Sequence, residues 1–171
     1  MSKVITFSRT FPLYHPRKGD PTYFVEQSWN GLNILKLPVP KNEDVPSDFL
    51  WSILPLSNYG EKYHTIRKGY RWKVGDKFSP RVWSGKPYQS KQIIIAPDIE
   101  IKKIWDVEIF IESDRIHIAH KLTHNTLELF PFNQVAKNDG LTFKDMKDWF
   151  NVKPDKPFIG QIICWNENIE Y

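Results

Sequence analysis

Three consecutive segments between residues 92 and 121 constrain the fold most, because each alternates apolar and polar side chains. They are Gln92–Ala96, Glu100–Ile111 and Arg115–Lys121. A period of two places the apolar side chains on one face of a β-strand. Shorter patterns predict further strands at Val4–Ser8, Tyr63–Arg67, Lys77–Trp83 and Phe158–Trp165. So many strands in 171 residues predict a small, strongly bent mixed or antiparallel sheet, and closure into a barrel would remove its exposed edges.

Two helices are predicted beside these strands, which makes the fold class α+β. Asp20-Pro21 is a helix-start signal, and we expect a helix over about Pro21–Leu32. Thr142 opens the second helix, with Asp145 in a capping-box relation to it. Residues 37–59 contain four prolines and no clean period, and we interpret them as an insertion in a single domain of residues 1–171. Their SDFLWSIL segment predicts one short capped helical turn.

A basic and aromatic stretch runs from Gly60 to Lys91. It holds nine Lys or Arg and two acids, a local charge of +7, whereas the whole chain carries +4. Six aromatic residues are interleaved with these cations. Cations neutralise phosphate and aromatic faces stack on bases, so the stretch is typical of a nucleic-acid or nucleotide ligand surface. A twisted strand pair with a solvated basic face is the alternative.

Composition narrows the chemistry and the location. The one cysteine, Cys164, excludes an internal disulfide and any multi-cysteine metal site. The five histidines lack metal-ligand spacing, so neither a metal site nor a cofactor is expected. No apolar run approaches the ~18 residues that span a bilayer, and the first residues are too broken by charge for a signal peptide. We therefore expect a cytoplasmic protein that does not bind membranes, and we leave its oligomeric state open.

The start of the basic stretch brings three donor side chains together. In a strand, residues two apart share a face, so Thr65 and Arg67 point together, away from Ile66. Lys62 precedes the strand beside Gly60, whose permissive backbone would let the lysine turn toward Thr65. An ammonium, a hydroxyl and a guanidinium suit a phosphate, a carboxylate or a polarised carbonyl. An exposed edge strand with solvated cations is the alternative.

These residues resemble a known family. The segment GEKYHTIR, residues 60–67, fits the G-x-K-x-x-T-x-R signature of ASCH domains in the PUA-like superfamily. The following WKVGDKF turn and the late DGLTFKDMKDWF helix come in that family's order. The opening FSRTFPLYHPRKGDPTYFVEQSW is similar to a phage and Bacteroidetes-type subgroup. The resemblance implies a PUA-like (ASCH) mixed β-barrel flanked by helices, with a role in binding RNA or nucleotides.

Some small members of this family are amidohydrolases that remove the acyl group from N4-acylated cytidines. The resemblance carries their catalytic lysine and threonine onto Lys62 and Thr65, and their glutamate onto Asp139. A threonine nucleophile needs a base, and a lysine serves as one only when its pKa falls. Asp139 would then shuttle the proton to the leaving amine. The alternative is that Asn138-Asp139-Gly140 is only a turn, in which the aspartate bonds its own backbone.

The remaining candidate residues would bind the ligand. Arg67, Lys68 and Arg71 provide cations beside the signature, and Trp83, Lys86 and Tyr88 would form a base-stacking rim at a tight turn. The leading prediction is binding of RNA or a modified nucleotide or nucleoside in this basic, aromatic-lined cleft. The alternatives are an amidohydrolase acting through Lys62, Thr65 and Asp139, a ribonuclease using the same cations, and a protein-interaction module with an acidic partner.

Overall fold

The computed structural model describes residues 3–34, 56–123 and 126–171. Within these ranges the chain is α+β, with two sheets, three α-helices and a short 3-10 helix at Leu56–Asn58. The strands are β1 (Lys3–Thr6), β2 (His64–Lys68), β3 (Lys77–Trp83), β4 (Gln92–Ile94), β5 (Ile99–Glu100), β6 (Lys103–Glu112), β7 (Arg115–Thr123), β8 (Thr126–Leu129) and β9 (Phe158–Cys164). The helices are α1 (Phe24–Gly31), α2 (Phe132–Asn138) and α3 (Phe143–Phe150). Most of the insertion expected at 37–59, with its helical turn, lies outside the described residues.

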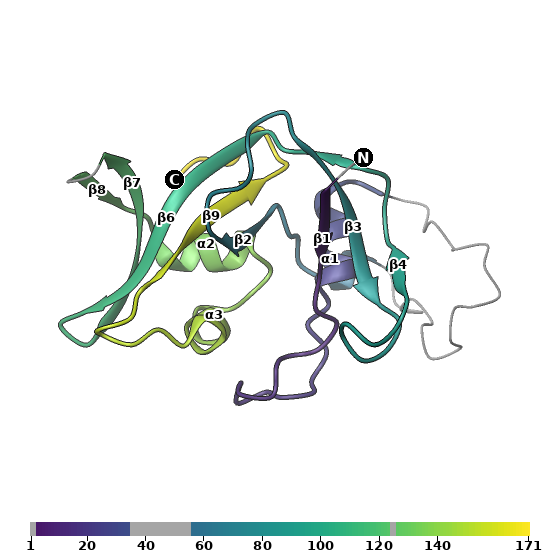
Figure 1. Cartoon of the computed structure of the whole chain (residues 1–171), viewed down its shortest axis with the longest axis horizontal. Coiled ribbons are helices and arrows are strands. Elements are labelled where there is room, and N and C mark those ends of the chain that lie inside the picture. Colours follow the sequence, from purple (N-terminus) through teal and green to yellow (C-terminus); the bar gives the residue numbers. More distant parts are fainter. Residues whose placement is uncertain (1–2, 35–55, 124–125) are drawn as a thin grey trace.

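One sheet is purely antiparallel, and the other is mixed. The larger has the order β2-β9-β6-β7-β8 and is antiparallel throughout. In the smaller, β3 pairs with β1 in parallel and with β4 and β5 antiparallel. Figure 1 shows the sheets beside each other, with α2 and α3 below the larger one. Trp29 on α1 donates a 2.7 Å hydrogen bond from Nε1 to the Ile95 carbonyl, which ties α1 to the smaller sheet.

The prediction that the sheet closes into a barrel is wrong, because the strands form two separate sheets in the described ranges. One predicted strand, Glu100–Ile111, divides into β5 and β6, since the chain leaves β3 after Glu100 and joins β9 at Lys103. On the other side, β2 forms no ladder with β1. A side-chain bond from Arg67 Nη2 to the Thr6 carbonyl, 2.7 Å long, joins them instead. The opening that remains between β1 and β2 is where the site lies.

Apolar packing joins the two sheets. Trp165 beyond β9 contacts Phe7 beyond β1 and Phe78 on β3, with ring centroids 6.2 and 6.0 Å apart. Phe78 is completely buried and also meets Trp72 edge-on. Offset and edge-to-face ring pairs at such distances stabilise a core beyond their buried area. The sheets are therefore fixed relative to each other although no ladder closes them.

The helix predictions had mixed outcomes. The cap at Thr142 is confirmed, since its Oγ1 accepts the Asp145 amide N–H at 3.1 Å. The start of the first helix is wrong. It begins at Phe24, after Tyr23 in the left-handed region at φ 58°, because Pro21 is instead engaged in a β-bridge with Thr10. The short helix α2 was not predicted at all.

Candidate functional site

A buried ion pair forms the centre of the candidate site. Lys62 Nζ lies 2.7 Å from Asp139 Oδ1 and also donates to the Asp139 carbonyl oxygen. The two residues are 77 positions apart in the chain. Lys62 is 1% exposed and Asp139 is 6% exposed. The lysine therefore does not lie on a solvated edge strand, and the aspartate does more than close a turn.

Backbone contacts hold this pair in place. The Lys62 amide donates to the Gln27 carbonyl of α1 at 2.9 Å, and the Tyr63 amide donates to the Asn138 carbonyl of α2 at 2.8 Å. Gly31 permits the first contact, because a Cβ there would lie 2.2 Å from the Lys62 carbonyl oxygen. The segment before β2 is thus fastened between α1 and α2. Asp139 itself follows the last turn of α2, where its amide bonds the Val135 carbonyl at 3.0 Å.

Two further side chains complete the surroundings of the pair. The Phe24 ring of α1 lies 4.3 Å from Lys62 Nζ, close enough for a cation–π contact. His64 is fully buried, and its Nδ1 lies 3.4 Å from the same Asp139 oxygen. The sequence patterns single out neither residue. Strand alternation places His64 on the face opposite to Thr65 and Arg67, and only the fold brings it to Asp139.

Burial and charge change the acidity of these groups. Burial lowers the pKa of Lys62, an effect that Asp139 partly offsets and Arg67 reinforces. Burial alone would raise the pKa of Asp139, but Lys62 and His64 outweigh it and hold that pKa below its usual range. Burial also lowers the pKa of His64, which keeps the imidazole neutral. The result is an ionised carboxylate beside a lysine that loses its proton more readily than usual.

A cavity of about 230 Å³ opens beside the pair, and we call it the inner cavity. It brings together six residues singled out in the sequence: Lys62, Thr65, Arg67, Trp83, Tyr88 and Asp139. Its other walls come from the end of β1 with the residues after it, from Phe24, from Ile66, from Pro87 and from the end of α3. Thr65 is 5% exposed and lies on β2. The cavity therefore occupies the opening between the two sheets.

Arg67 is the second basic side chain that lines this cavity, beside Lys62. Its guanidinium lies 5.8 Å from the Phe7 ring centroid and donates from Nη2 to the Thr6 carbonyl. Among the described residues its Nε is buried and has no hydrogen-bond partner. Burial lowers the pKa of this arginine. A half-buried guanidinium whose Nε has no partner is a donor that suits an acceptor supplied by a ligand.

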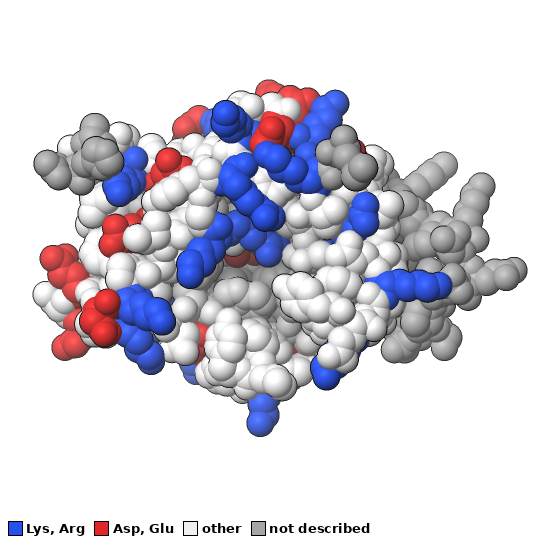
Figure 2. Space-filling model, viewed as in Figure 1, with Lys and Arg blue, Asp and Glu red and all other residues white. Residues whose placement is uncertain are grey.

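The rim of the inner cavity is aromatic and exposed. The Trp83 and Tyr88 rings are 5.3 Å apart, and Tyr88 is 88% exposed with a positive φ of 63°. The other three predicted cations, Lys68, Arg71 and Lys86, are exposed and do not line the cavity. Figure 2 shows Lys and Arg side chains gathered over the middle of one face, next to a recess. These cations thus contribute to the surface and not to the buried centre.

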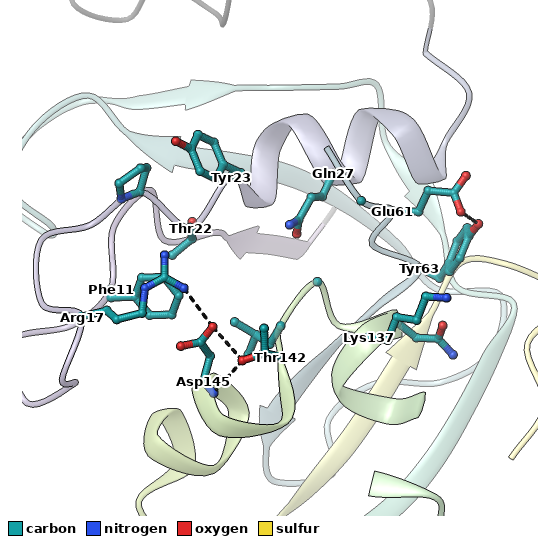
Figure 3. A pocket seen from close by; sticks show the side chains of 15 residues that line it. Phe11, Arg17, Thr22, Tyr23, Gln27, Glu61, Tyr63, Lys137, Thr142 and Asp145 are labelled. Atoms are coloured by element: carbon teal, nitrogen blue, oxygen red, sulfur yellow. Dashed lines mark hydrogen bonds and ion pairs between the residues drawn. The ribbon is translucent and has the colours of Figure 1, made fainter. Parts of the chain in front are cut away.

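A second cavity, of about 300 Å³, lies between the loop after β1 and the helices; we call it the Arg17 cavity. Figure 3 shows Arg17 reaching Asp145, whose Oδ2 is 2.9 Å from Arg17 Nη1 and 2.9 Å from Thr142 Oγ1. On the opposite side Tyr63 donates to Glu61. The acids in this cavity are satisfied by neighbouring side chains. We interpret these contacts as structural, because they hold the loop before α1 against α3.

In the described ranges, no three His, Cys, Asp or Glu side chains come together as metal ligands. None of the helices described there has the length and apolar character to span a bilayer. Comparison with family models, with curated proteins and with solved structures found no match for this chain.

Proposed function

We propose that the inner cavity binds a modified nucleoside and hydrolyses an amide bond on its base, as in N4-acetylcytidine. The observation that supports this proposal is the buried contact between Lys62 and Asp139 beside Thr65. Groups with perturbed pKa values cluster at functional sites, so the lowered pKa of this buried lysine favours a catalytic role. The resemblance of residues 60–67 to the ASCH signature gives the class of substrate.

The proposed reaction gives each side chain a defined role. The Thr65 hydroxyl attacks the acyl carbon, and its proton passes to the neutral amine of Lys62. Arg67 stabilises the negative charge on the acyl oxygen of the tetrahedral intermediate. Collapse breaks the C–N bond, and the proton returns through Lys62 and Asp139 to the leaving amine. Water then hydrolyses the acyl-threonine ester, which releases the carboxylic acid and restores the hydroxyl.

Incubation with N4-acetylcytidine is expected to release cytidine and acetate, which chromatography detects. Cytidine itself and an amide without a base, such as N-acetylglycine, serve as control compounds. The proposal predicts turnover of the acylated nucleoside and none of the simple amide. If cytidine does not appear at any pH between 6 and 10, the hydrolase proposal fails.

The pH dependence of the reaction is a further prediction. Lys62 acts as a base only when it is deprotonated, so kcat/KM rises with pH through its pKa. Burial lowers that pKa, and we expect the rising limb below the usual lysine value of about 10.4. Asp139 raises the pKa of Lys62, so Asp139→Asn should reduce the rate and move the limb to lower pH. Asp155→Asn, an exposed acid, is the matched control. A limb that moves to higher pH in Asp139→Asn would contradict the assignment of Lys62 as base.

Binding without hydrolysis is the second candidate function. The exposed cations Lys68, Arg71 and Lys86, together with exposed Tyr88, favour it, because cations and a free aromatic face suit RNA. The two candidates differ in the turnover experiment. Binding of the nucleoside or of RNA with no release of cytidine would favour this second function.

A further inference from the structure

A neighbouring cavity shares part of its wall with the inner cavity. This outer cavity has a volume of about 320 Å³. It shares four lining residues with the inner one: Phe7, Ser8, Trp83 and Pro87. The inner cavity alone is smaller than the range of roughly 300–1,000 Å³ that is typical of small-molecule sites. We call the two together the groove. Their combined volume falls within this range, Trp83 lines both cavities, and the Lys62–Asp139 pair lines only the inner one.

The outer end of the groove is lined largely by apolar atoms, with one cation and one hydroxyl beyond the shared wall. Its remaining lining residues are Arg9, Thr10, Pro21 and Gly85. Backbone contacts hold this segment, since the Thr22 amide bonds the Arg9 carbonyl at 2.9 Å and Thr22 Oγ1 bonds the Ser8 carbonyl at 2.7 Å. Arg9 also faces Glu26 on α1, so a ligand would share its charge with that acid. Arg9 and Thr10 are exposed and follow β1 in this backbone-bonded segment, and a guanidinium beside a hydroxyl suits a phosphate.

We infer that the outer cavity is a phosphate subsite, and that the groove takes a phosphorylated nucleoside whose phosphate contacts Arg9 and Thr10. The order of groups along the groove carries this inference. A base that reaches the Lys62–Asp139 end lies past Trp83, so the sugar and its phosphate extend toward the outer cavity. The assignment of the base rests on the proposed function, whereas the phosphate contact rests on the groove alone.

A binding experiment with compounds that do not react tests the subsite. Titration calorimetry compares cytidine with cytidine 5′-monophosphate, at two salt concentrations, for the wild type, Arg9→Gln and the control Arg115→Gln. Arg115 is exposed at the start of β7. We expect the monophosphate to bind the wild type about tenfold more tightly than cytidine, as one charge-assisted bond to phosphate permits. Arg9→Gln should abolish most of this preference, and Arg115→Gln should retain it.

Two results would overturn the inference: equal affinities for the two compounds in the wild type, or a preference that survives in Arg9→Gln. The outcome is independent of catalysis. A phosphate preference without hydrolysis of N4-acetylcytidine would remove the proposed function and keep the subsite. Hydrolysis without a phosphate preference would do the reverse. A short oligonucleotide that competes with the monophosphate identifies nucleotides within RNA as the source of the phosphate, and failure to compete identifies free nucleotides.

Discussion

Lys62→Met is expected to destabilise the folded protein by about 3–5 kcal/mol, because it leaves the Asp139 carboxylate buried without its cation. Asp139→Asn should cost less. The lysine that it leaves behind already has a lowered pKa from burial, and it can become neutral by releasing its proton. Urea unfolding at neutral pH measures both values. Lys144→Met, on the exposed side of α3, is the matched control and should change stability by less than about 0.5 kcal/mol.

The double variant Lys62→Met/Asp139→Asn should be more stable than Lys62→Met alone. It removes both charges, and a buried ion pair replaced by neutral groups is often tolerated. Non-additivity of up to about 3 kcal/mol is expected for two side chains in direct contact. If the change in the free energy of unfolding of the double variant equals the sum of the two single changes, the presence of the ion pair is contradicted.

The cost of Lys62→Met should also depend on pH. In the wild type the lowered pKa of Asp139 contributes stability above the usual carboxyl pKa, which is lost as pH falls through the folded-state value. Without Lys62 the strongest influence that lowers this pKa is gone, and burial raises it. The variant therefore recovers part of its loss, relative to the wild type, as the pH falls and the buried carboxyl takes up a proton.

Thr65→Val is expected to reduce kcat for N4-acetylcytidine by at least about a thousandfold, as loss of a nucleophile does in other hydrolases. Valine has nearly the shape of threonine and suits the strand β2, so the fold should persist. Thr65→Ser keeps a hydroxyl and should retain measurable turnover. Steady-state kinetics and a denaturation curve for each variant separate loss of chemistry from loss of structure. If Thr65→Val keeps more than a tenth of kcat, the hydroxyl is not the nucleophile.

The sequence predicted the secondary structure of this protein where that structure depends on residues close together in the chain. Alternation of side chains is a property of neighbouring residues, and it located β3, β6, β7 and β9 to within a few residues. The Thr142 cap is equally local, because its hydroxyl bonds an amide three residues away. The first helix start failed where a longer-range contact intervened, since the bridge of Pro21 to Thr10 displaced the expected cap.

The candidate site depended on contacts between distant segments. The basic stretch and the signature identify Lys62, Thr65 and Arg67 as a group, but they predict donors near a surface. Alternation predicts which residues share a face of a strand, but it does not predict how far the rest of the chain buries that face. The burial of Lys62 arises because α1 and α2 both bond its backbone segment. His64 joins the pair for the same reason.

The sequence by itself determined an α+β chain, most of its strands and six of the residues that line the inner cavity. Only the tertiary structure decided that the sheets stay apart, that β5 and β6 are separate strands, and that Lys62 and Asp139 meet in a buried pair. The physical reason is range. Strand periodicity and helix caps depend on residues a few positions apart. Sheet closure and burial depend on packing between distant segments, such as those of Lys62 and Asp139, which are 77 positions apart.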